Sequence, residues 1–187
     1  IVTKEIIPNE NSIRYGGPEK RRELYQSIQR KVKQAGLWAP HLPEEYGGMG
    51  IGFLKHAYMN EILAWSPFSN PIFGILAPNS GNQKILVKYG TPEQKKKWLE
   101  PLVAGTMQSC FAMTEPDAPG ADPRSIRTRA VRDGDEWVIN GEKFYISGLG
   151  DPRCKIMIVM VRSNPDADTY KQQSQILVPV GTPGVEI

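Results

Sequence analysis

The chain has 187 residues, of which 40% are hydrophobic, and its 23 Lys or Arg against 20 Asp or Glu give a formal net charge of +3. This length allows one domain or two small ones. A charge this small and scattered gives no indication of nucleic acid as the main partner. No run of ~18 apolar residues could cross a bilayer, and no apolar secretory segment lies near the start, so we expect a soluble protein without an integral membrane segment.

The cysteines and histidines predict no metal site. Cys110 and Cys154 lie in apolar surroundings without the spacing of metal ligands, and His41 and His56 are isolated in the sequence. Structural zinc sites need four such ligands, usually in closely spaced pairs. Two cysteines of this kind fit a reducing, intracellular compartment best.

Residues 1–105 show the hydrophobic period of helices, about 3.6. Pro18 opens the clearest helix, in which Leu24, Ile28 and Val32 repeat every four residues, and Gly36 is placed to end it. Further helices are predicted over 53–65 and 79–89. The first of these draws its apolar surface from Phe53, Ala57, Met59, Ile62 and Leu63.

One more helix is predicted to start at Thr91. Thr91 is its N-cap, Pro92 takes the first helical position, and Gln94 completes a capping box. The helical pattern ends near Gly105, which we take as the boundary between two domains.

Beyond Gly105 the hydrophobic period falls to about 2, which predicts strands. Asp133-Gly134 and Asn140-Gly141 are hairpin signals, because both central turn residues need positive φ, and they bracket a short strand over 136–139. Continuous apolar runs predict strands over 155–161, covered on both faces, and over 175–180. Residues 184–187 look like the start of another strand, so the second domain is expected to be incomplete. The predicted fold class is α+β, with a helical domain over 1–105 and a β domain over 106–187.

Two segments of the β domain contain most of the chemical information. Residues 110–122 read Cys-Phe-Ala-Met-Thr-Glu-Pro-Asp-Ala-Pro-Gly-Ala-Asp, and residues 142–148 read Glu-Lys-Phe-Tyr-Ile-Ser-Gly. The first resembles the signature of the acyl-CoA dehydrogenase family, and the second resembles that family's Gly-x-Lys-aromatic-Trp-Ile-Ser/Thr strand. Residues 43–50 and 89–99 also match segments of the family, and the four blocks follow the family's order.

The resemblance implies a fold and a reaction. It implies an N-terminal helical domain and an antiparallel, β-barrel-like middle domain, with the family's C-terminal helical bundle absent from the chain. It implies FAD as the cofactor and an acyl-CoA thioester as the substrate, which loses its pro-R α-proton to a base and a β-hydrogen, as hydride, to flavin N5. The product would be the trans-2-enoyl-CoA. In the family the base is a Glu of a later helical domain, so no catalytic residue is assigned in this chain.

The resemblance also implies partners and a metabolic setting. Electrons would pass to an electron-transfer flavoprotein, and the protein would be a homodimer or homotetramer. Its role would lie in fatty-acid β-oxidation, in the bacterial cytoplasm or in the mitochondrial or peroxisomal matrix. Residues 148–155 and the long turn over 115–122 look more like the branch that includes long-chain and 4-hydroxyacyl-CoA dehydrogenases than like the short- and medium-chain enzymes.

Five residues are predicted to contact the flavin. Isoalloxazine is a flat aromatic ring with a polar edge, so its site needs an aromatic face and hydrogen-bond donors. Phe111 and Met113 alternate along a strand and would share one face. By resemblance, Thr114 supplies a hydroxyl and an amide to the pyrimidine side, Tyr145 stands where the family commonly has Trp against the ring, and Ser147 brings a hydroxyl near N5. The alternative interpretation makes Phe111 and Tyr145 ordinary core aromatics and Thr114 an ordinary strand residue.

The Gly- and Pro-rich turn over 117–122 is the predicted substrate contact. Its backbone amides, chiefly at Gly120 and Ala121, could meet the pantetheine or pyrophosphate of CoA. The family often has Ser where this chain has Ala121, so a hydroxyl contact to CoA is missing. Glu115 precedes a proline at a strand end, where a carboxylate sets a turn or caps a helix more often than it catalyses.

Two other functions are compatible with the same sequence. An acyl-CoA oxidase, or another flavin oxidase of this fold, would keep the FAD and differ in its reaction with oxygen. A non-catalytic flavin- or acyl-CoA-binding protein would need no base at all.

Overall fold

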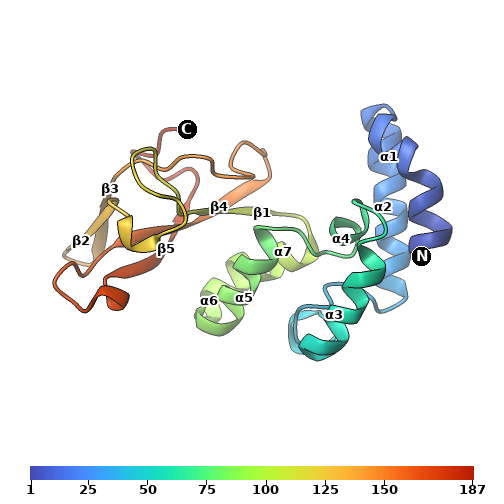
Figure 1. The fold of residues 1–187 in the computed structure, drawn as a ribbon, viewed down its shortest axis with the longest axis horizontal. Helices are drawn as coiled ribbons and strands as arrows, with labels where there is room; N and C mark the ends of the chain where they lie inside the picture. Colours follow the sequence, from blue (N-terminus) through green and yellow to red (C-terminus); the bar gives the residue numbers. More distant parts are fainter. The chain divides into compact units, whose positions relative to one another are not determined.

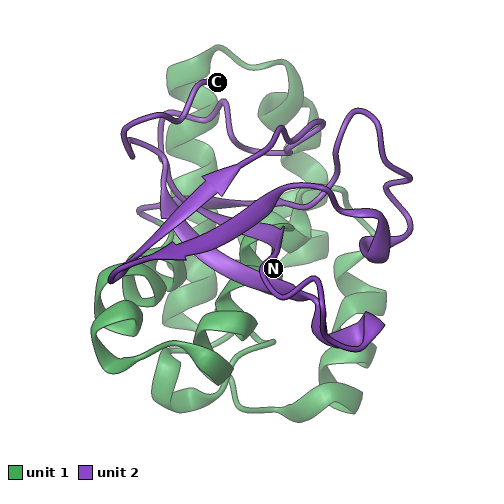
Figure 2. Cartoon of the chain, turned by 90° about the vertical axis from the view of Figure 1, so that its left-hand side faces the viewer, with its two compact units in different colours: residues 1–105 green, residues 106–187 purple.

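The computed structural model describes residues 1–187 as two compact units, Ile1–Gly105 and Thr106–Ile187 (Figure 2). Unit 1 contains helices and no strand, whereas unit 2 contains every strand of the chain. No helix in either unit is both long enough and apolar enough to cross a membrane.

Unit 1 is a set of helices joined by turns (Figure 1). Its α-helices are α1 (Glu10–Tyr15), α2 (Pro18–Gln34), α3 (Gly52–Leu63), α4 (Ser69–Ile72), α5 (Asn79–Tyr89), α6 (Pro92–Gln94) and α7 (Glu100–Ala104). Val2–Ile6 and Lys95–Leu99 form wider, π-helical turns. Ile7–Asn9 and Glu44–Tyr46 form tighter, 3-10 helical turns. The helices predicted to start at Pro18 and to cover 53–65 and 79–89 are therefore confirmed.

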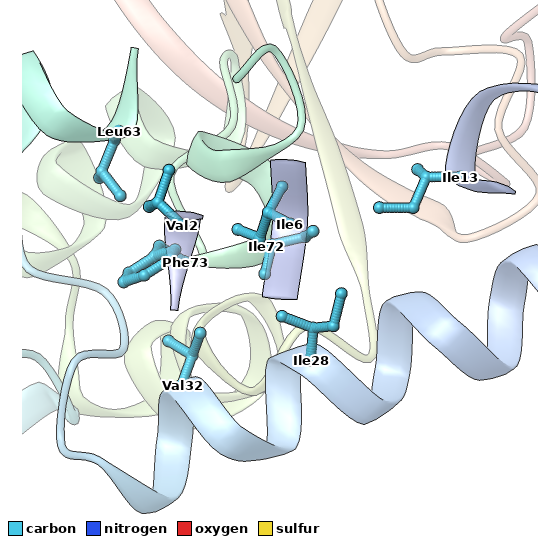
Figure 3. Close-up of a cluster of buried hydrophobic side chains, with 8 residues drawn as sticks. All are labelled: Val2, Ile6, Ile13, Ile28, Val32, Leu63, Ile72 and Phe73. Carbon is cyan, nitrogen blue, oxygen red and sulfur yellow. The ribbon is translucent and has the colours of Figure 1, made fainter. Parts of the chain in front are cut away.

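The core of unit 1 forms around the predicted apolar face of α2. Ile28 and Val32 lie one turn apart on that face, and both are buried (Figure 3). They belong to one buried cluster: Val2, Ile6, Ile13, Ile28, Val32, Leu63, Ile72 and Phe73. Burial of this face, rather than helix propensity, supplies most of the stability of such a helix.

The hydrophobic period predicts helix α3, but it does not predict which face of this helix packs against the core. Leu63 is buried and Met59 packs against the cluster, but Phe53 is 85% exposed and Ile62 is 48% exposed. Apolar residues occur all around this helix, so its sequence does not single out the face that packs.

The helix predicted from Thr91 forms in three pieces. Gln94 N donates to Thr91 Oγ1 at 3.2 Å and Thr91 N donates to Gln94 Oε1 at 3.0 Å, so the predicted capping box is confirmed. Between α6 and α7 the helix widens, and Glu100 N donates to Lys95 O. The widening comes directly before Pro101, which has no N–H to donate and crowds the carbonyl of the preceding turn.

Unit 2 is a five-stranded sheet. Its strands are β1 (Gln108–Ala112), β2 (Arg129–Asp133), β3 (Glu136–Asn140), β4 (Cys154–Arg162) and β5 (Gln173–Pro179) (Figure 1). Strand β4 pairs with β1 and with β5, and it meets β2 where Arg162 lies opposite Arg129. The strands predicted over 136–139, 155–161 and 175–180 are confirmed.

The sheet is mixed, which corrects the prediction of an antiparallel barrel. Strand β1 is parallel to β4, while β2–β3 and β4–β5 are antiparallel pairs. Parallel pairing requires a long connection between the strands, and residues 113–153 supply it. A hydrophobic period of 2 identifies strands, but it contains no information on their direction or partners.

One of the two predicted hairpins forms. Asp133 pairs with Glu136, so the loop between β2 and β3 is Gly134-Asp135, one residue later than predicted. Of these two loop residues, only Gly134 has a positive φ, at +59°. The second predicted hairpin, at Asn140-Gly141, is wrong. Gly141 has φ +156°, and a Cβ there would lie 2.4 Å from Thr128 Oγ1, so the glycine allows close passage of two segments rather than a tight turn.

The core of unit 2 lies on one side of β1 and around β4. Its buried members are Cys110, Ala112, Ala130, Cys154, Met157, Val159 and Val161. Neither cysteine forms a disulfide, and burial raises the pKa of the Cys110 thiol to about 12, so this thiol stays protonated and packs as a small apolar group. Consecutive buried residues from Ile156 to Val159 confirm that β4 is covered on both faces. Residues 184–187 contain no strand, so that prediction is wrong.

Candidate functional site

The two segments singled out in the sequence lie side by side just beyond β1. Phe144 N donates to Thr114 O at 2.9 Å, and Thr114 Oγ1 donates in return to Phe144 O. Further along, a Cβ added to Gly148 would lie 3.6 Å from Ser109 O. Residues 144–148 therefore run antiparallel to 109–114, although they do not form a regular strand.

A buried ion pair joins the same two segments. Lys143 Nζ donates to Glu115 Oε1 at 2.8 Å and to Met113 O at 3.0 Å. The side chains of Lys143 and Glu115 are 11% and 5% exposed. Glu115 also accepts from Arg127 N at 2.7 Å, from Thr128 N at 2.9 Å and from Thr128 Oγ1 at 2.5 Å. Both carboxylate oxygens thus accept hydrogen bonds, and the donors come from two separate stretches of chain, residues 127–128 and Lys143.

These contacts hold Glu115 in its ionised form. Burial alone would raise the pKa of this carboxyl, but hydrogen bonds from Lys143, Thr128 and the amides of Arg127 and Thr128 lower the pKa to about 2. Burial lowers the pKa of Lys143, and the charge and hydrogen bond of Glu115 oppose that change. A carboxylate with so low a pKa is a poor proton acceptor, which agrees with a turn-setting role for Glu115 rather than a catalytic one.

Phe144 and Tyr145 form an exposed aromatic surface. Their ring centroids are 4.1 Å apart with the ring planes at 47°, and the residues are 46% and 85% exposed. Tyr145 has φ +56°, which is uncommon for a residue other than glycine and costs conformational energy. An exposed ring on a strained backbone is not a core residue, so the alternative interpretation of Tyr145 is wrong for this structure.

The other residues predicted to contact flavin lie on the same two segments. Phe111 in β1 and Met113 directly after it are half-buried and alternate with the buried Cys110 and Ala112, so neither belongs to the core cluster. Ser147 is exposed and follows the aromatic surface along the chain.

The predicted substrate turn folds back on Thr114. A Cβ on Gly120 would lie 3.0 Å from Thr114 Cγ2, so a larger residue at this position would push the turn away. Met113, Thr114 and Gly120 line one small hollow together with Pro119. The substrate turn therefore packs against residues 113–114 of the same motif.

The turn itself is held by local hydrogen bonds. Asp122 Oδ1 accepts from Arg124 N at 3.0 Å and from Arg124 Nε at 2.8 Å, and Ser125 Oγ donates to Pro119 O at 3.1 Å. Ala121 is exposed on this turn. It offers backbone groups but no side-chain hydroxyl, as the sequence indicates.

Lys143 and Thr128 are the site residues that the sequence did not identify. Lys143 was visible only as one letter of the second motif, and its burial depends on a partner 28 positions earlier in the chain. Thr128 lies outside both motifs. The one available signal for the ion pair was the place of Lys143 in the second motif, directly before the aromatic residues Phe144 and Tyr145.

A comparison with protein-family models identifies both units. Residues 1–106 match the model of the N-terminal domain of acyl-CoA dehydrogenase, and residues 110–187 match the model of its middle domain. Among curated proteins, FadE2 of Mycobacterium tuberculosis, named as an acyl-CoA dehydrogenase, is 44% identical over 88% of this chain and 40% of its own length. Human acyl-CoA dehydrogenase family member 11 is 41% identical over 100% of this chain and 23% of its own length.

Solved structures agree with the family models. A Mycobacterium abscessus protein assigned to the acyl-CoA dehydrogenases has a TM-score of 0.87 at 37% identity, over 98% of this chain and 48% of its own. Glutaryl-CoA dehydrogenase of Mycobacterium smegmatis, solved in complex with FADH2, has a TM-score of 0.69 at 26% identity, over 98% of this chain and 43% of its own. The chain thus spans less than half the length of each of these relatives. It belongs to the acyl-CoA dehydrogenase family, of which it contains the N-terminal helical domain and the middle sheet domain.

Proposed function

We propose that this chain forms the flavin-holding part of an FAD-dependent enzyme that converts an acyl-CoA thioester to its trans-2-enoyl-CoA. The observation that supports this most is the direct bonding of Thr114 to Phe144, because it joins the two motifs that resemble the family's flavin segments. Family membership supports the same reaction, since the matched models and relatives are acyl-CoA dehydrogenases.

The residues at this site fit a flavin. A planar, aromatic ring needs an apolar face, and the exposed Tyr145 and Phe144 rings provide one beside the half-buried Phe111 and Met113. It also needs polar groups at its edge, which Thr114 and Ser147 would supply. The Thr114 hydroxyl hydrogen is committed to Phe144 O, so its oxygen is left as an acceptor. FAD, when bound, supplies the capacity to accept a hydride.

The chain's own residues would then bind and orient rather than transfer protons. The Gly120–Ala121 backbone would contact the CoA moiety beside Thr114, and Ala121 would add no side-chain hydroxyl to that contact. Glu115 does not serve as the base, because Lys143 and Thr128 occupy it and its pKa is about 2. We therefore place the base for the α-proton outside these 187 residues.

The same proposal includes the protein's partners. Electrons would leave to an electron-transfer flavoprotein, and the enzyme would work as a homodimer or homotetramer in fatty-acid β-oxidation. Family membership supports these assignments.

A turnover assay of the full-length native protein tests the reaction. The protein is purified, its FAD content is measured, and it is mixed with a series of acyl-CoAs and either electron-transfer flavoprotein or an artificial acceptor. We expect bound FAD and one enoyl-CoA formed for each two-electron reduction of the acceptor. Peroxide formed in place of reduced acceptor would identify an oxidase instead. Absence of bound FAD, or of any product, would contradict the proposed function.

A further inference from the structure

Two charged residues of the flavin motifs have no part in the proposed contacts with the ring. Glu115 and Lys143 belong to different motifs, yet their side chains meet at 2.8 Å and are almost fully buried. Burying a carboxylate and an ammonium together costs several kcal/mol of desolvation per ion, and an apolar pair of similar size is often as stable or more so. Stability alone is therefore a weak reason for charges at this position.

The contacts of this pair point to a positioning role. Lys143 is bonded to both Glu115 and Met113 O, and the next residue, Phe144, is bonded to Thr114. The second motif is thereby fixed to residues 113–115 at successive positions along the chain. One residue further lies Tyr145, with its positive φ. A strained conformation of this kind persists only where the surrounding structure determines it strongly.

The Glu115 carboxylate also binds a third segment, residues 127–128. Arg127 N and both Thr128 groups donate to Glu115, so the stretch leading into β2 is bound by the residue that binds Lys143. Lysine and glutamate are suited to this because each makes several charge-assisted hydrogen bonds at once, which no apolar pair can do. The pair thus connects three segments, and one of them continues directly into the exposed aromatic surface of Phe144 and Tyr145.

We propose that the Glu115–Lys143 ion pair positions Thr114 and Tyr145 for the flavin ring, and that it sets FAD affinity and the environment of the bound flavin rather than taking part in the reaction. This deepens the proposed function and rests on it, since it assumes that FAD binds at this surface. Neither residue touches the ring, so both act through the backbone of their neighbours. Residues that hold a site within about 0.5 Å of its working geometry are commonly required for its affinity.

The test uses the full-length native protein and compares wild type with a neutral double variant, Glu115→Gln/Lys143→Met. Removing both charges leaves no unpaired buried ion, so this variant is expected to fold where Lys143→Met alone leaves a buried carboxylate unpaired. We expect the double variant to bind FAD about tenfold more weakly, the equivalent of one charge-assisted hydrogen bond. We also expect the visible circular dichroism of bound FAD to change at saturating FAD, which a loss of stability alone would not cause.

Two further variants complete the design. Arg132→Met removes a charged side chain from the exposed β2–β3 hairpin of the same unit, and it should change neither FAD affinity nor the flavin spectrum. Thr128→Val removes one donor to Glu115 and keeps both charges, so a partial loss of FAD affinity is expected even if the double variant does not fold.

The outcomes separate this inference from the proposed function. If wild-type protein does not bind FAD, the proposed function fails. If wild type binds FAD and every folded variant binds it with equal affinity and an identical spectrum, the positioning role is overturned while the flavin site stands.

Discussion

Thr114 and Phe144 exchange two hydrogen bonds, one between their backbones at 2.9 Å and one from the Thr114 hydroxyl to Phe144 O. Only the second depends on a side chain. A substitution of Thr114 can therefore remove the hydroxyl hydrogen bond while the backbone hydrogen bond to Phe144 remains.

Thr114→Val keeps the shape of the side chain and removes its hydroxyl. We expect a loss of about 1 kcal/mol in the free energy of unfolding, the usual net value of one hydrogen bond, and weaker FAD binding. Urea denaturation and FAD titration measure the two effects. Thr182→Val is the matched control, because Thr182 donates only to Pro179 O within a local turn of the same unit and should leave FAD affinity unchanged. Equal FAD affinity in Thr114→Val and wild type would show that this hydroxyl does not reach the flavin.

Tyr145 should affect cofactor binding without supporting the fold. Its ring is 85% exposed and its φ is +56°, so Tyr145→Gly removes aromatic area while relieving backbone strain. We expect the thermal midpoint of Tyr145→Gly to equal or exceed that of wild type, while its FAD content after gel filtration falls. Tyr145→Ala should also retain less FAD than Ser147→Ala, because a stacked ring contributes more than one exposed hydroxyl. Equal FAD retention in the Tyr145 and Ser147 variants would contradict this order.

Glu115 should make the stability of the protein depend on pH below about 4.5. Burial would raise the pKa of its carboxyl, but the donors around it lower the pKa to about 2, below its ordinary value. The ionised carboxylate therefore contributes its full stability above pH ~4.5, and this contribution is lost as the pH falls toward 2. We expect Glu115→Gln to be less stable than wild type at neutral pH, and the difference to shrink steadily in urea titrations toward pH 3.

An exposed acid provides the control for that experiment. Asp135 lies on the β2–β3 turn with its side chain fully exposed, so Asp135→Asn should match wild type at each pH. A constant deficit of Glu115→Gln from pH 7 to pH 3 would show that the carboxylate is not held by these donors.

A side chain at position 141 should destabilise the protein. A Cβ there would lie 2.4 Å from Thr128 Oγ1 and 2.7 Å from Thr128 Cα, and φ is +156°. We expect Gly141→Ala to lose about 1–3 kcal/mol, since the backbone of Thr128 must shift. Gly150→Ala, where no atom lies within 4 Å of the added Cβ, should differ little from wild type. Thermal unfolding of both variants measures the contrast, and similar midpoints would show that residues 128 and 141 are further apart than described.

Much of the fold was predictable because local signals determine it. The capping box at Thr91, the apolar face of α2 and the continuous apolar run of β4 each depend on neighbours in the sequence, and each forms as predicted. The mixed sheet was not predictable in this way. Strand direction depends on which distant strand pairs with β4, and an alternating pattern is the same for parallel and antiparallel neighbours.

In the candidate site, too, the features that depend on contacts between distant residues were not predicted from the sequence. Motif resemblance predicts Thr114 and Tyr145 as flavin contacts, but it gives no information on the positive φ of Tyr145 or on the burial of Lys143 against a partner 28 positions earlier. Asn140-Gly141 misled the prediction for the same reason. Position 141 needs a glycine because Thr128 passes too close for a Cβ, and Thr128 lies too far away in the sequence for a local pattern to indicate this contact.

The most direct test of the flavin site is a crystal structure of the full-length native protein with FAD bound. We expect the isoalloxazine to lie against Tyr145, with its polar edge within hydrogen-bond distance of Thr114, and Glu115 and Lys143 to remain paired without touching the ring. A flavin bound away from Thr114 and Tyr145 would show that these two motifs do not form the flavin site.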